Sequence, residues 1–573
     1  MTGKFRGRKV RLLAASGLMA TGLLAGALTG ITASTASASS AKVSASSHAP
    51  LVMESSPETS VTDNFNPYIS SSAATLLGAT SLIYETLLQF DVANPTQVPY
   101  HFLATGFSWG ANGKSITFAI RHNVKFSDGS AMTPADVAFT YNLLKQFPDI
   151  NTTGLPITKA TASGTNVTIT FSSSQYTNLQ NIATVYIVPK SIWGAISGDP
   201  SKFIVTSPIG TGPYTLESFT PEGFTLQANK SYWGGPWAVG SPPKVATVEF
   251  PALTSNNTVL SQLVGNQLDW AGNFITGLQK AFVSGHPTHK VWFAPVNTVT
   301  LYPNLTVWPT NQLPVRQAIS LAISRNTLSA QGESGFEPAA TNASGLTLPN
   351  FKALISPSVA KSTLSGKANV KAAEAVLTAA GYTKNGKGWF AKNGKVVSLT
   401  VTDPASYSDY AADDAIVATE LKAAGIDATF DGQSVPAWGT DVGNGDYQLT
   451  THWGTTSISA YQLYNYWLNS SLYTSSPKSV SGDFERLNNK AVDAELTKLA
   501  SATTVAAQKV DLAPIEQYVA TQLPVIPTLY GAAFDEYNTS SFSGWPSASN
   551  PYESGSPNTP TNEVVVLHLK PTS

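Results

Sequence analysis

The chain has 573 residues, a formal net charge of −1 and no cysteine, and only 12% of its residues are charged. The lack of cysteine excludes disulfides, thiolate metal sites, a cysteine nucleophile and a membrane anchor built on a lipid-modified cysteine. Five of the 34 basic residues and none of the 35 acidic ones lie in the first 38 residues, so the remainder carries a net charge of −6, which excludes a nucleic-acid binder.

Residues 1–38 have the features of a secretory signal peptide. Basic residues precede an apolar run from Leu12 to Ile31, and Ala36-Ser37-Ala38 offers a small-residue cleavage site. The run is also nearly long enough to be an uncleaved membrane anchor, but its small residues favour cleavage. We therefore expect an exported protein that is not lipid-anchored through cysteine, with a small, polar, disordered leader at residues 39–50.

The first half of the mature chain predicts mainly short strands and turns. Residues 73–90 form an apolar, helix-like run. A hairpin follows, because Ile116, Phe118 and Ile120 alternate on one face and Asn112-Gly113 supplies a tight turn. This half therefore predicts a unit rich in β-structure.

The stretch "KFSDGSAMTPADV", residues 125–137, joins a strand to a helix. Asp128-Gly129 is a turn dipeptide, and Thr133-Pro134 begins a helix that runs to about Lys145. The Thr133 hydroxyl can accept a backbone N–H, and Asp136 suits the positive end of the helix dipole.

The second half alternates helices and strands. The stretch "LPVRQAISLAISRNTLSA" places Val315, Ala318, Ile319 and Ala322 on one helical stripe. Two further helices, residues 371–380 and 411–424, end at Gly381 and Gly425, and each glycine leads back toward a strand. Such alternation predicts parallel strands with crossover helices, in an α/β unit that begins near Asn304. Near the end of the chain, "EVVVLHLKP", residues 563–571, predicts a last strand that rejoins the first unit.

Motifs for enzymatic or metal chemistry are weak. The stretch "GANGKS" lacks the first glycine of a phosphate-binding loop, because that position holds Ser108, and a strand follows it. His286 and His289 could present two imidazoles to a metal, but Pro287 breaks helical spacing, so two solvent histidines in a loop are favoured. We expect no catalytic residue, no metal and no cofactor.

Aromatic residues in turn-like settings are the remaining candidates for ligand contact. About two thirds of them belong to packing by the usual behaviour of aromatic residues, and the rest could line a cleft. Rings beside neutral polar groups such as Asn304, Thr455 and Gln462 suit an uncharged, extended ligand.

Seven stretches in order resemble a known family, the family 5 extracellular solute-binding proteins of ABC importers, of oligopeptide- and dipeptide-binding type. They are "IYETLLQFD", "LATGFSWGANGKSITFAIRHNVKFSDGSAMTPADVAFTYN", "PIGTGPYTLESF", "NKSYWGG", "VRQAISLAISR", "AAGY" and "LPVIPTLY".

This resemblance implies an α/β fold of two lobes, of the periplasmic-binding-protein type (class II-like, cluster C). Lobe I would span residues 51–303, with an extra β-rich subdomain at about 92–206, and lobe II would span residues 304–530. Residues 531–573 would return to lobe I, so the chain would cross the hinge near Asn304 and near Tyr530.

The resemblance also implies a solute held between the lobes and passed to a membrane permease. Peptide-binding relatives often use an acid shortly after a Trp-containing strand end, but the matching stretch here, "HWGTTSISAYQLYNYW", holds no Asp or Glu. That stretch and "GWPSASNPY" are similar to a branch that includes binders of cello- and related oligosaccharides. Peptide and oligosaccharide both remain open as the ligand, and a secreted hydrolase or a surface signalling protein remains open as the class.

Family position and chemistry together single out eight residues for ligand contact in a monomeric protein. They are Tyr68, Asn304, Trp308, Trp438, Trp453, Gly454, Tyr461 and Trp545.

Overall fold

The computed structural model describes residues 49–237, 240–474 and 482–572. The predicted signal peptide and nearly all of the predicted leader lie outside these residues. Within the described ranges, no helix combines the length and the apolar character that crossing a membrane requires.

The first lobe, as we use the term, comprises residues 49–291 and 535–572 and contains two sheets besides its subdomain. One sheet has the order β1-β10-β9-β8, and the other has the order β11-β21-β12. Their strands are β1 (Leu51–Val52), β8 (Tyr214–Thr220), β9 (Gly223–Ala228), β10 (Thr247–Pro251), β11 (Trp270–Ala271), β12 (His289–Val291) and β21 (Glu536–Asn538). The short pairs are β2 (Leu88–Gln89) with β3 (Tyr100–His101) and β22 (Phe542–Ser543) with β23 (Lys570–Pro571).

A four-stranded antiparallel sheet of order β4-β5-β7-β6 forms the β-rich part between these segments. Its strands are β4 (Ala104–Trp109), β5 (Ser115–Ile120), β6 (Ile157–Ser163) and β7 (Asn166–Phe171). The predicted hairpin is confirmed: β4 pairs antiparallel with β5, and Asn112 and Gly113 take the positive φ values that such a turn requires, 58° and 63°. The bounds of the subdomain stay a prediction.

The helices of the first lobe are short except α3, which packs on β6 and β7. They are α1 (Ala73–Leu76), α2 (Thr80–Ile83), α3 (Pro134–Gln146), α4 (Leu179–Ala183), α5 (Lys190–Trp193), α6 (Asn256–Val264) and α16 (Asn562–His568). Single turns lie at η1 (Ala111–Gly113), η2 (Pro148–Ile150), η3 (Tyr176–Asn178), η4 (Pro200–Lys202) and η5 (Gln279–Val283).

The helix predicted to begin at Thr133 is confirmed as α3. The Thr133 backbone N–H and hydroxyl both donate to Asp136 Oδ2, at 2.9 and 2.6 Å. The other carboxylate oxygen of Asp136 accepts the N–H of Lys190 at 3.0 Å, so this side chain also ties α3 to α5. The Asp136 carboxylate therefore accepts the hydrogen bonds at the start of α3, and the Thr133 hydroxyl acts as a donor.

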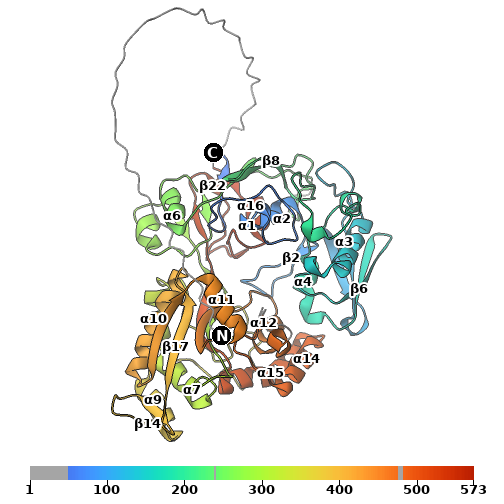
Figure 1. Ribbon diagram of the computed structural model, residues 1–573. Helices are drawn as coiled ribbons and strands as arrows, with labels where there is room; N and C mark the ends of the chain where they lie inside the picture. The colour runs from blue at the N-terminus through green and yellow to red at the C-terminus, as the bar shows by residue number, and fades with distance from the viewer. Residues whose placement is uncertain (1–48, 238–239, 475–481, 573) are drawn as a thin grey trace, which may run out of the picture. The chain divides into compact units, whose positions relative to one another are not determined.

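The second lobe, residues 294–533, is built on a mixed sheet of order β18-β17-β19-β13-β20. Its strands are β13 (Ala294–Pro303), β17 (Ser398–Pro404), β18 (Asp427–Gln433), β19 (Leu449–Trp453) and β20 (Ile526–Ala533). β17 pairs in parallel with β18 and is joined to it by helix α10 (Ser408–Ala423), which lies beside β17 in Figure 1. The predicted parallel pairing with a crossover helix is thus confirmed.

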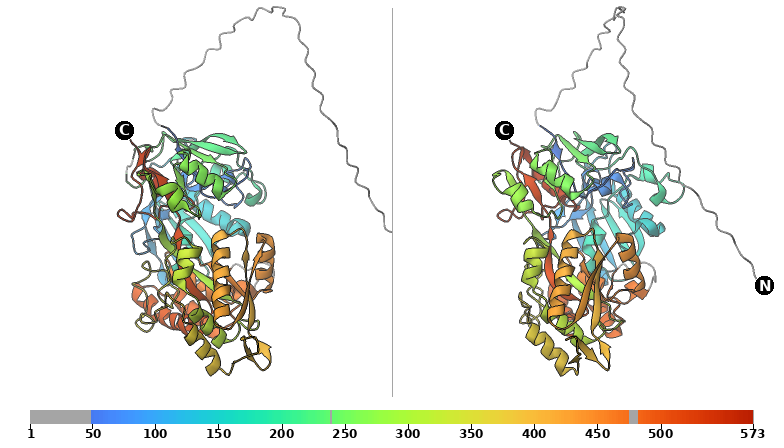
Figure 2. Two further views of the ribbon diagram at one scale, coloured as in Figure 1. Left: turned by 90° about the vertical axis from the view of Figure 1, so that its left-hand side faces the viewer. Right: turned by 60° about the vertical axis from the view of Figure 1, so that its left-hand side comes forward.

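The helices of the second lobe carry the predicted apolar stripes and glycine stops. Val315, Ala318, Ile319 and Ala322 are all buried on one helix. Gly381 and Gly425, which follow the ends of two other helices, have positive φ values of 81° and 77°. The helices are α7 (Leu313–Ala322), α8 (Arg325–Thr327), η6 (Leu328–Gly332), α9 (Val370–Ala379), α10 (Ser408–Ala423), α11 (Val435–Asn444), α12 (Ala460–Leu468), α13 (Ser471–Thr474), α14 (Lys490–Ala500) and α15 (Val505–Gln522). A small sheet joins β14 (Thr383–Lys384), β15 (Phe390–Lys392) and β16 (Lys395–Val396). Figure 2 shows the orange helices of this lobe running alongside its orange strands.

The chain changes sheet at two places, and both differ from the expected crossings. β12 pairs with β21 of the first lobe, whereas β13 pairs with β19 and β20 of the second. Residues 294–303 therefore belong to the sheet of the second lobe, and not to lobe I as their position before Asn304 suggested. The return crossing falls after β20, at residues 534–535, and not at Tyr530. A strand belongs to the sheet whose hydrogen bonds it shares, and the sequence of β13 does not reveal its partners.

Two elements correct local expectations. Residues 73–90 contain two separate helical turns, α1 and α2, and the strand β2, because Gly78 (φ of 78°) interrupts the run. The expected last strand is instead the helix α16, with β23 after it. All three valines of α16 are buried, and a helix buried on every side shows no helical period in its sequence.

Candidate functional site

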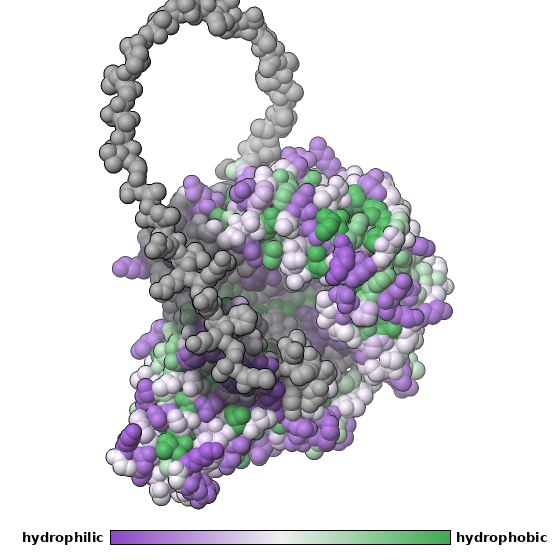
Figure 3. Space-filling model, in the orientation of Figure 1, coloured by the Kyte–Doolittle hydropathy of each residue, from purple (hydrophilic) through white to green (hydrophobic). Residues whose placement is uncertain are grey.

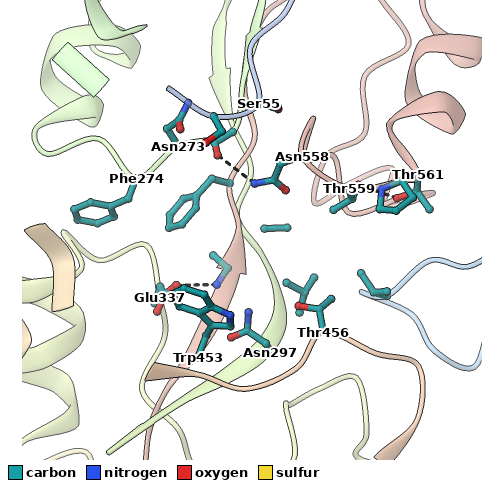
Figure 4. A pocket seen from close by; sticks show the side chains of 18 of the residues that line it. Ser55, Asn273, Phe274, Asn297, Glu337, Trp453, Thr456, Asn558, Thr559 and Thr561 are labelled. Carbon is teal, nitrogen blue, oxygen red and sulfur yellow. Dashed lines mark hydrogen bonds between the residues drawn. The ribbon is translucent and has the colours of Figure 1, made fainter. Parts of the chain in front are cut away.

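A cavity of about 850 Å³ is lined by residues from both lobes. Figure 3 shows the surface hollowed in the middle of the face seen there. In Figure 4, Ser55, Asn273, Asn558, Thr559 and Thr561 of the first lobe lie on one side of the cavity, and Asn297, Glu337, Trp453 and Thr456 of the second lobe lie on the other. Further lining residues are Gln89, Phe90, Gln180, Thr184, Asn256, Gly272, Phe274, Val296, Tyr407, Ser408, Asp409, Tyr410, Ala532, Ala533 and Phe534.

Most of the polar lining is uncharged. Amides and hydroxyls come from asparagine, glutamine, serine and threonine, and rings come from phenylalanine, tyrosine and tryptophan. Among the described residues that line the cavity there is no lysine, arginine or histidine. Such walls suit a solute with hydrogen-bonding groups and flat apolar faces, and they offer nothing to pair with a phosphate or a carboxylate.

Among the described lining residues, two carry carboxyl groups, and both belong to the second lobe. Glu337 lies in the loop after η6, and its Oε1 accepts the N–H of Ala532 on β20 at 2.9 Å. Asp409 lies in the first turn of α10, directly after the carboxyl end of β17.

Burial controls the protonation of both groups. Burial, and then the nearby charges of Asp409 and Asp413, raise the pKa of Glu337 to about 8, against the lowering effect of the Ala532 hydrogen bond. Burial also raises the pKa of Asp409, although two backbone N–H groups of the helix start oppose it. The Glu337 carboxyl group is therefore mostly protonated at neutral pH.

Trp453 presents the most exposed ring of the second-lobe wall, at 41% exposed. It ends strand β19, and the rings of Tyr407 and Tyr410 lie 6.3 and 6.1 Å from it between centroids. His452 packs behind it at 4.0 Å, and burial lowers the pKa of this histidine to about 4, so the imidazole is neutral. The ring thus stands on a rigid aromatic support at the cavity surface.

The facing wall of the first lobe is held by buried carboxyl groups. The Asn273 amide donates to Glu54, and its backbone N–H donates to Glu536 Oε2 at 3.3 Å. Asn256 donates to the carbonyl oxygen of Phe274 at 2.7 Å. These bonds orient the asparagines before any solute arrives.

Of the eight residues predicted for ligand contact, Trp453 lines the cavity. Gly454 follows it directly, is buried, and donates its N–H to Thr298 at 2.8 Å. A Cβ on Gly454 would lie 2.9 Å from Leu463 Cδ1, so the glycine allows close packing behind the wall. Contact of either residue with a solute stays a prediction.

The other six lie away from the cavity lining, in packing roles. Tyr68 is buried against Trp193 and donates to the carbonyl of Tyr186 at 2.8 Å. Trp545 is stacked on Tyr537, with ring centroids 5.0 Å apart, within the core of the first lobe.

Four of the six belong to the second lobe. Asn304 is fully buried and bonds the carbonyls of Gly445 and Tyr447. The indole N–H groups of Trp308 and Trp438 donate to Val396 O and Thr450 Oγ1, at 3.0 and 2.9 Å. Tyr461 packs against the core formed by α12, α14 and α15.

The two carboxyl groups of the cavity were missed from the sequence. Asp409 had a usable signal, because ligands of open α/β sheets gather beyond the carboxyl ends of parallel strands, where this residue begins α10. Glu337 had no such signal in the sequence, because its loop lacks the periodic pattern of a helix or strand and its partner Ala532 is 195 residues away.

No group of three or more His, Asp or Glu side chains in the described ranges is arranged to hold a metal ion. The two histidines weighed from the sequence stack on each other at 4.7 Å. His289 is not a solvent histidine, since it is 2% exposed and bonds both Phe282 O and Asn266 Oδ1 at 2.8 Å.

Residues 98–475, well over half of the chain, match the family model described as bacterial extracellular solute-binding proteins, family 5 Middle. The structure is similar to that of a periplasmic oligopeptide-binding protein of an ABC transporter from Thermotoga maritima. The TM-score is 0.82 and the identity 23%, over 91% of this chain and 99% of that one. A second structure with that description, with mannohexaose bound, has a TM-score of 0.75, the same identity, and coverage of 91% and 98%. These similarities confirm the predicted two-lobe α/β fold.

A curated relative, the "probable peptide-binding protein YejA" of Agrobacterium fabrum, is 31% identical over 163 residues. That match covers 27% of this chain and 26% of the relative, so the chain spans about a quarter of the relative's length.

Proposed function

The chain belongs to family 5 of the bacterial extracellular solute-binding proteins, and on that basis we propose that it captures an extended solute outside the cytoplasm and delivers it to the permease of an ABC importer. It acts as a monomer, and no catalytic step is assigned to it. The observation that carries this proposal is the cavity of about 850 Å³ whose walls come from two lobes.

Closure of the lobes supplies the mechanism. A solute that touches both walls makes more contacts when the lobes approach each other, so its binding shifts the population toward the closed form. The permease then recognises the closed form. Only the difference in affinity between open and closed forms can drive this shift.

The solute is an oligopeptide or a similar extended molecule, and an oligosaccharide is the alternative. The name of the Agrobacterium relative supports the peptide, and the mannohexaose in the Thermotoga structure supports the sugar. The exposed ring of Trp453 and the many amides also suit a sugar, because rings stack on its apolar face and amides bond its hydroxyls.

Calorimetry of the mature chain against panels of peptides and oligosaccharides tests the proposal. We expect binding to one panel, recovery of the solute unchanged, and a smaller radius of gyration in solution scattering when solute is present. Turnover of a candidate oligosaccharide would instead indicate a secreted hydrolase. Unimpaired solute uptake after deletion would favour a surface signalling role.

A further inference from the structure

A second cavity, of about 660 Å³, lies beside the segments that join the lobes, and we call it the rear cavity. It is lined by Asp91 and Pro551 of the first lobe, by Trp292 at the crossing between the lobes, and by Pro349, Asn350 and Lys352 of the second lobe, among others. It shares no lining residue with the cavity of about 850 Å³, which we call the solute cavity.

The chain itself separates the two cavities. Val92 lines the solute cavity, whereas Asp91 and Ala93 on either side of it line the rear cavity. The Asn350 amide donates to the carbonyl oxygens of Val92 and Pro295, at 3.2 and 2.7 Å, and so ties the second lobe to this partition. A molecule in the rear cavity would therefore not occupy the place of the solute.

Apolar groups make up most of the wall of the rear cavity. Three prolines, three alanines and the ring of Trp292 supply them. The Trp292 ring is half-buried, and no other aromatic ring of the described residues packs against it. Pockets with such walls hold flat apolar groups, and a few polar groups then fix the orientation of the ligand.

Two hydrogen-bond donors of the rear cavity have no acceptor within the part of the chain that the structure describes. They are the indole N–H of Trp292 and the ammonium group of Lys352. Lys352 is exposed and takes part in none of the ion pairs of the described residues. Both groups can donate to the oxygens of an anion.

The charge of the rear cavity also favours an anion. Asp91 is the acidic residue of its described lining, but it is 3% exposed and its Oδ1 accepts the N–H of Ala93 at 2.9 Å. Burial raises the pKa of Asp91 to about 6, although this hydrogen bond opposes the shift. The exposed charge is therefore that of Lys352, whereas the described lining of the solute cavity holds no basic residue. A carboxylate finds a counter-charge in the rear cavity and none in the solute cavity.

We propose that the rear cavity is a second binding site, for a small carboxylate that carries a flat apolar ring. The ring packs on Trp292 and the prolines, and the carboxylate accepts from the indole N–H and pairs with Lys352. This site goes beyond the proposed function, because it lies apart from the solute cavity and binds a different class of molecule.

Calorimetry of the mature chain with three probes tests the site. Indole-3-propionate has the ring and the carboxylate, indole-3-propionamide has the ring without the charge, and propionate has the charge without the ring. We expect a Kd of about 1 mM or lower for indole-3-propionate, which is usual for a ligand of this size in a mostly apolar pocket. Each of the other two probes should bind at least about tenfold more weakly.

Variants assign the binding to the rear cavity. Lys352→Gln should remove the preference for the acid over the amide, and Lys361→Gln, at another exposed position of the second lobe, should keep it. Ala353→Phe fills the cavity from an exposed position, so it should fold and should weaken the binding of indole-3-propionate by at least about tenfold. Trp453→Ala alters the solute cavity and should leave the affinity for this probe unchanged.

Each other outcome overturns the proposal. If indole-3-propionate gives no heat of binding at about 10 mM, the rear site is absent, and the proposed delivery of a solute stands as before. Equal affinity for the acid and the amide shows that Lys352 does not select the ligand. Loss of binding in Trp453→Ala, or full binding in a folded Ala353→Phe variant, shows that the probe binds outside the rear cavity.

Discussion

Trp453 combines high exposure with a place on the cavity wall. Its ring is 41% exposed, and the rings of His452, Tyr407 and Tyr410 lie 4.0, 6.3 and 6.1 Å from it between centroids. The ring of Trp545, by contrast, is buried and packs against the rings of Trp270 and Tyr537.

Trp453→Ala should weaken solute binding by about 2 kcal/mol, roughly thirtyfold, because the stacking face is lost. The free energy of unfolding should fall by less than about 1 kcal/mol, since the ring is already partly in water. Calorimetry and urea unfolding measure the two quantities. Trp237→Ala is the matched control, because that ring is 43% exposed and lies outside the cavity lining. Equal affinity of both variants would remove Trp453 from the site.

Asn304→Ala, in contrast, should lower the stability of the fold. The Asn304 amide donates to two carbonyls, at 2.9 and 3.0 Å, and its oxygen accepts the N–H and the hydroxyl of Thr306. Removing these bonds leaves buried groups unpaired, so we expect the free energy of unfolding to fall by about 2–4 kcal/mol. Urea unfolding measures this loss. A variant as stable as the parent, but unable to bind solute, would return Asn304 to the ligand site.

At the scale of elements, two segments connect the lobes beside the cavity. Gln180 of α4 accepts from the Ser457 hydroxyl and the Ile458 N–H, both at 3.1 Å. Gln462 of α12 donates to Asn178 at 2.8 Å. These bonds join residues 178–180 of the first lobe to the loop after β19 and to the helix α12 that follows it.

Gln462→Ala should loosen this connection and favour separation of the lobes. We expect a larger radius of gyration with solute present, and an affinity about two- to fivefold lower, since one hydrogen bond contributes about 0.5–1 kcal/mol. Gln517→Ala, at an exposed position of α15, is the control. Scattering curves that do not differ between the two variants would show that the bond does not hold the lobes.

At the scale of the whole molecule, many carboxyl groups of the described residues are buried without a basic partner close enough to form an ion pair. Burial raises the pKa of Glu54 and Glu85 to about 7 and that of Asp91 and Asp269 to about 6. The ion pairs Lys384–Glu374, Lys490–Asp493 and Lys498–Glu495 are partly or largely exposed and contribute little to stability.

This imbalance predicts a protein that is more stable in mild acid than in mild alkali. The folded state holds these protons more tightly than the unfolded chain, whose carboxyl groups titrate near pH 4. Their stabilisation is complete below about pH 4 and is lost as the pH rises through 6 and 7. We expect the free energy of unfolding to be at least about 3 kcal/mol larger at pH 5 than at pH 8, as each pKa unit corresponds to about 1.4 kcal/mol.

Urea unfolding across this pH range measures the effect. Glu54→Gln keeps an oxygen for the Asn273 amide and cannot ionise, so it should reduce the pH dependence and raise stability at pH 8. A stability that increases from pH 5 to pH 8 would contradict the prediction.

Local patterns of the sequence were sufficient for several elements of both lobes. The stripe of Val315 and Ile319, the stops at Gly381 and Gly425, and the turn at Asn112-Gly113 depend on contacts within a few residues, so the sequence predicts them correctly. The same short range explains the errors. The valines of α16 favour a strand locally, but burial on all sides and bonds from Asn562 to Gly78 and Pro557 hold them in a helix.

The sequence by itself determined the alternation of strands and helices, the shortage of charge and the family resemblance, because each is a property of composition or of neighbouring residues. Only the tertiary structure decided which side chains face the cavity. Glu337 meets Ala532 and Asp409 across long stretches of chain, while six of the eight expected contact residues are rings or amides whose hydrogen-bonding groups already bond within the protein. Burial and pairing are set by groups that the chain brings together from far apart, and no local pattern records them.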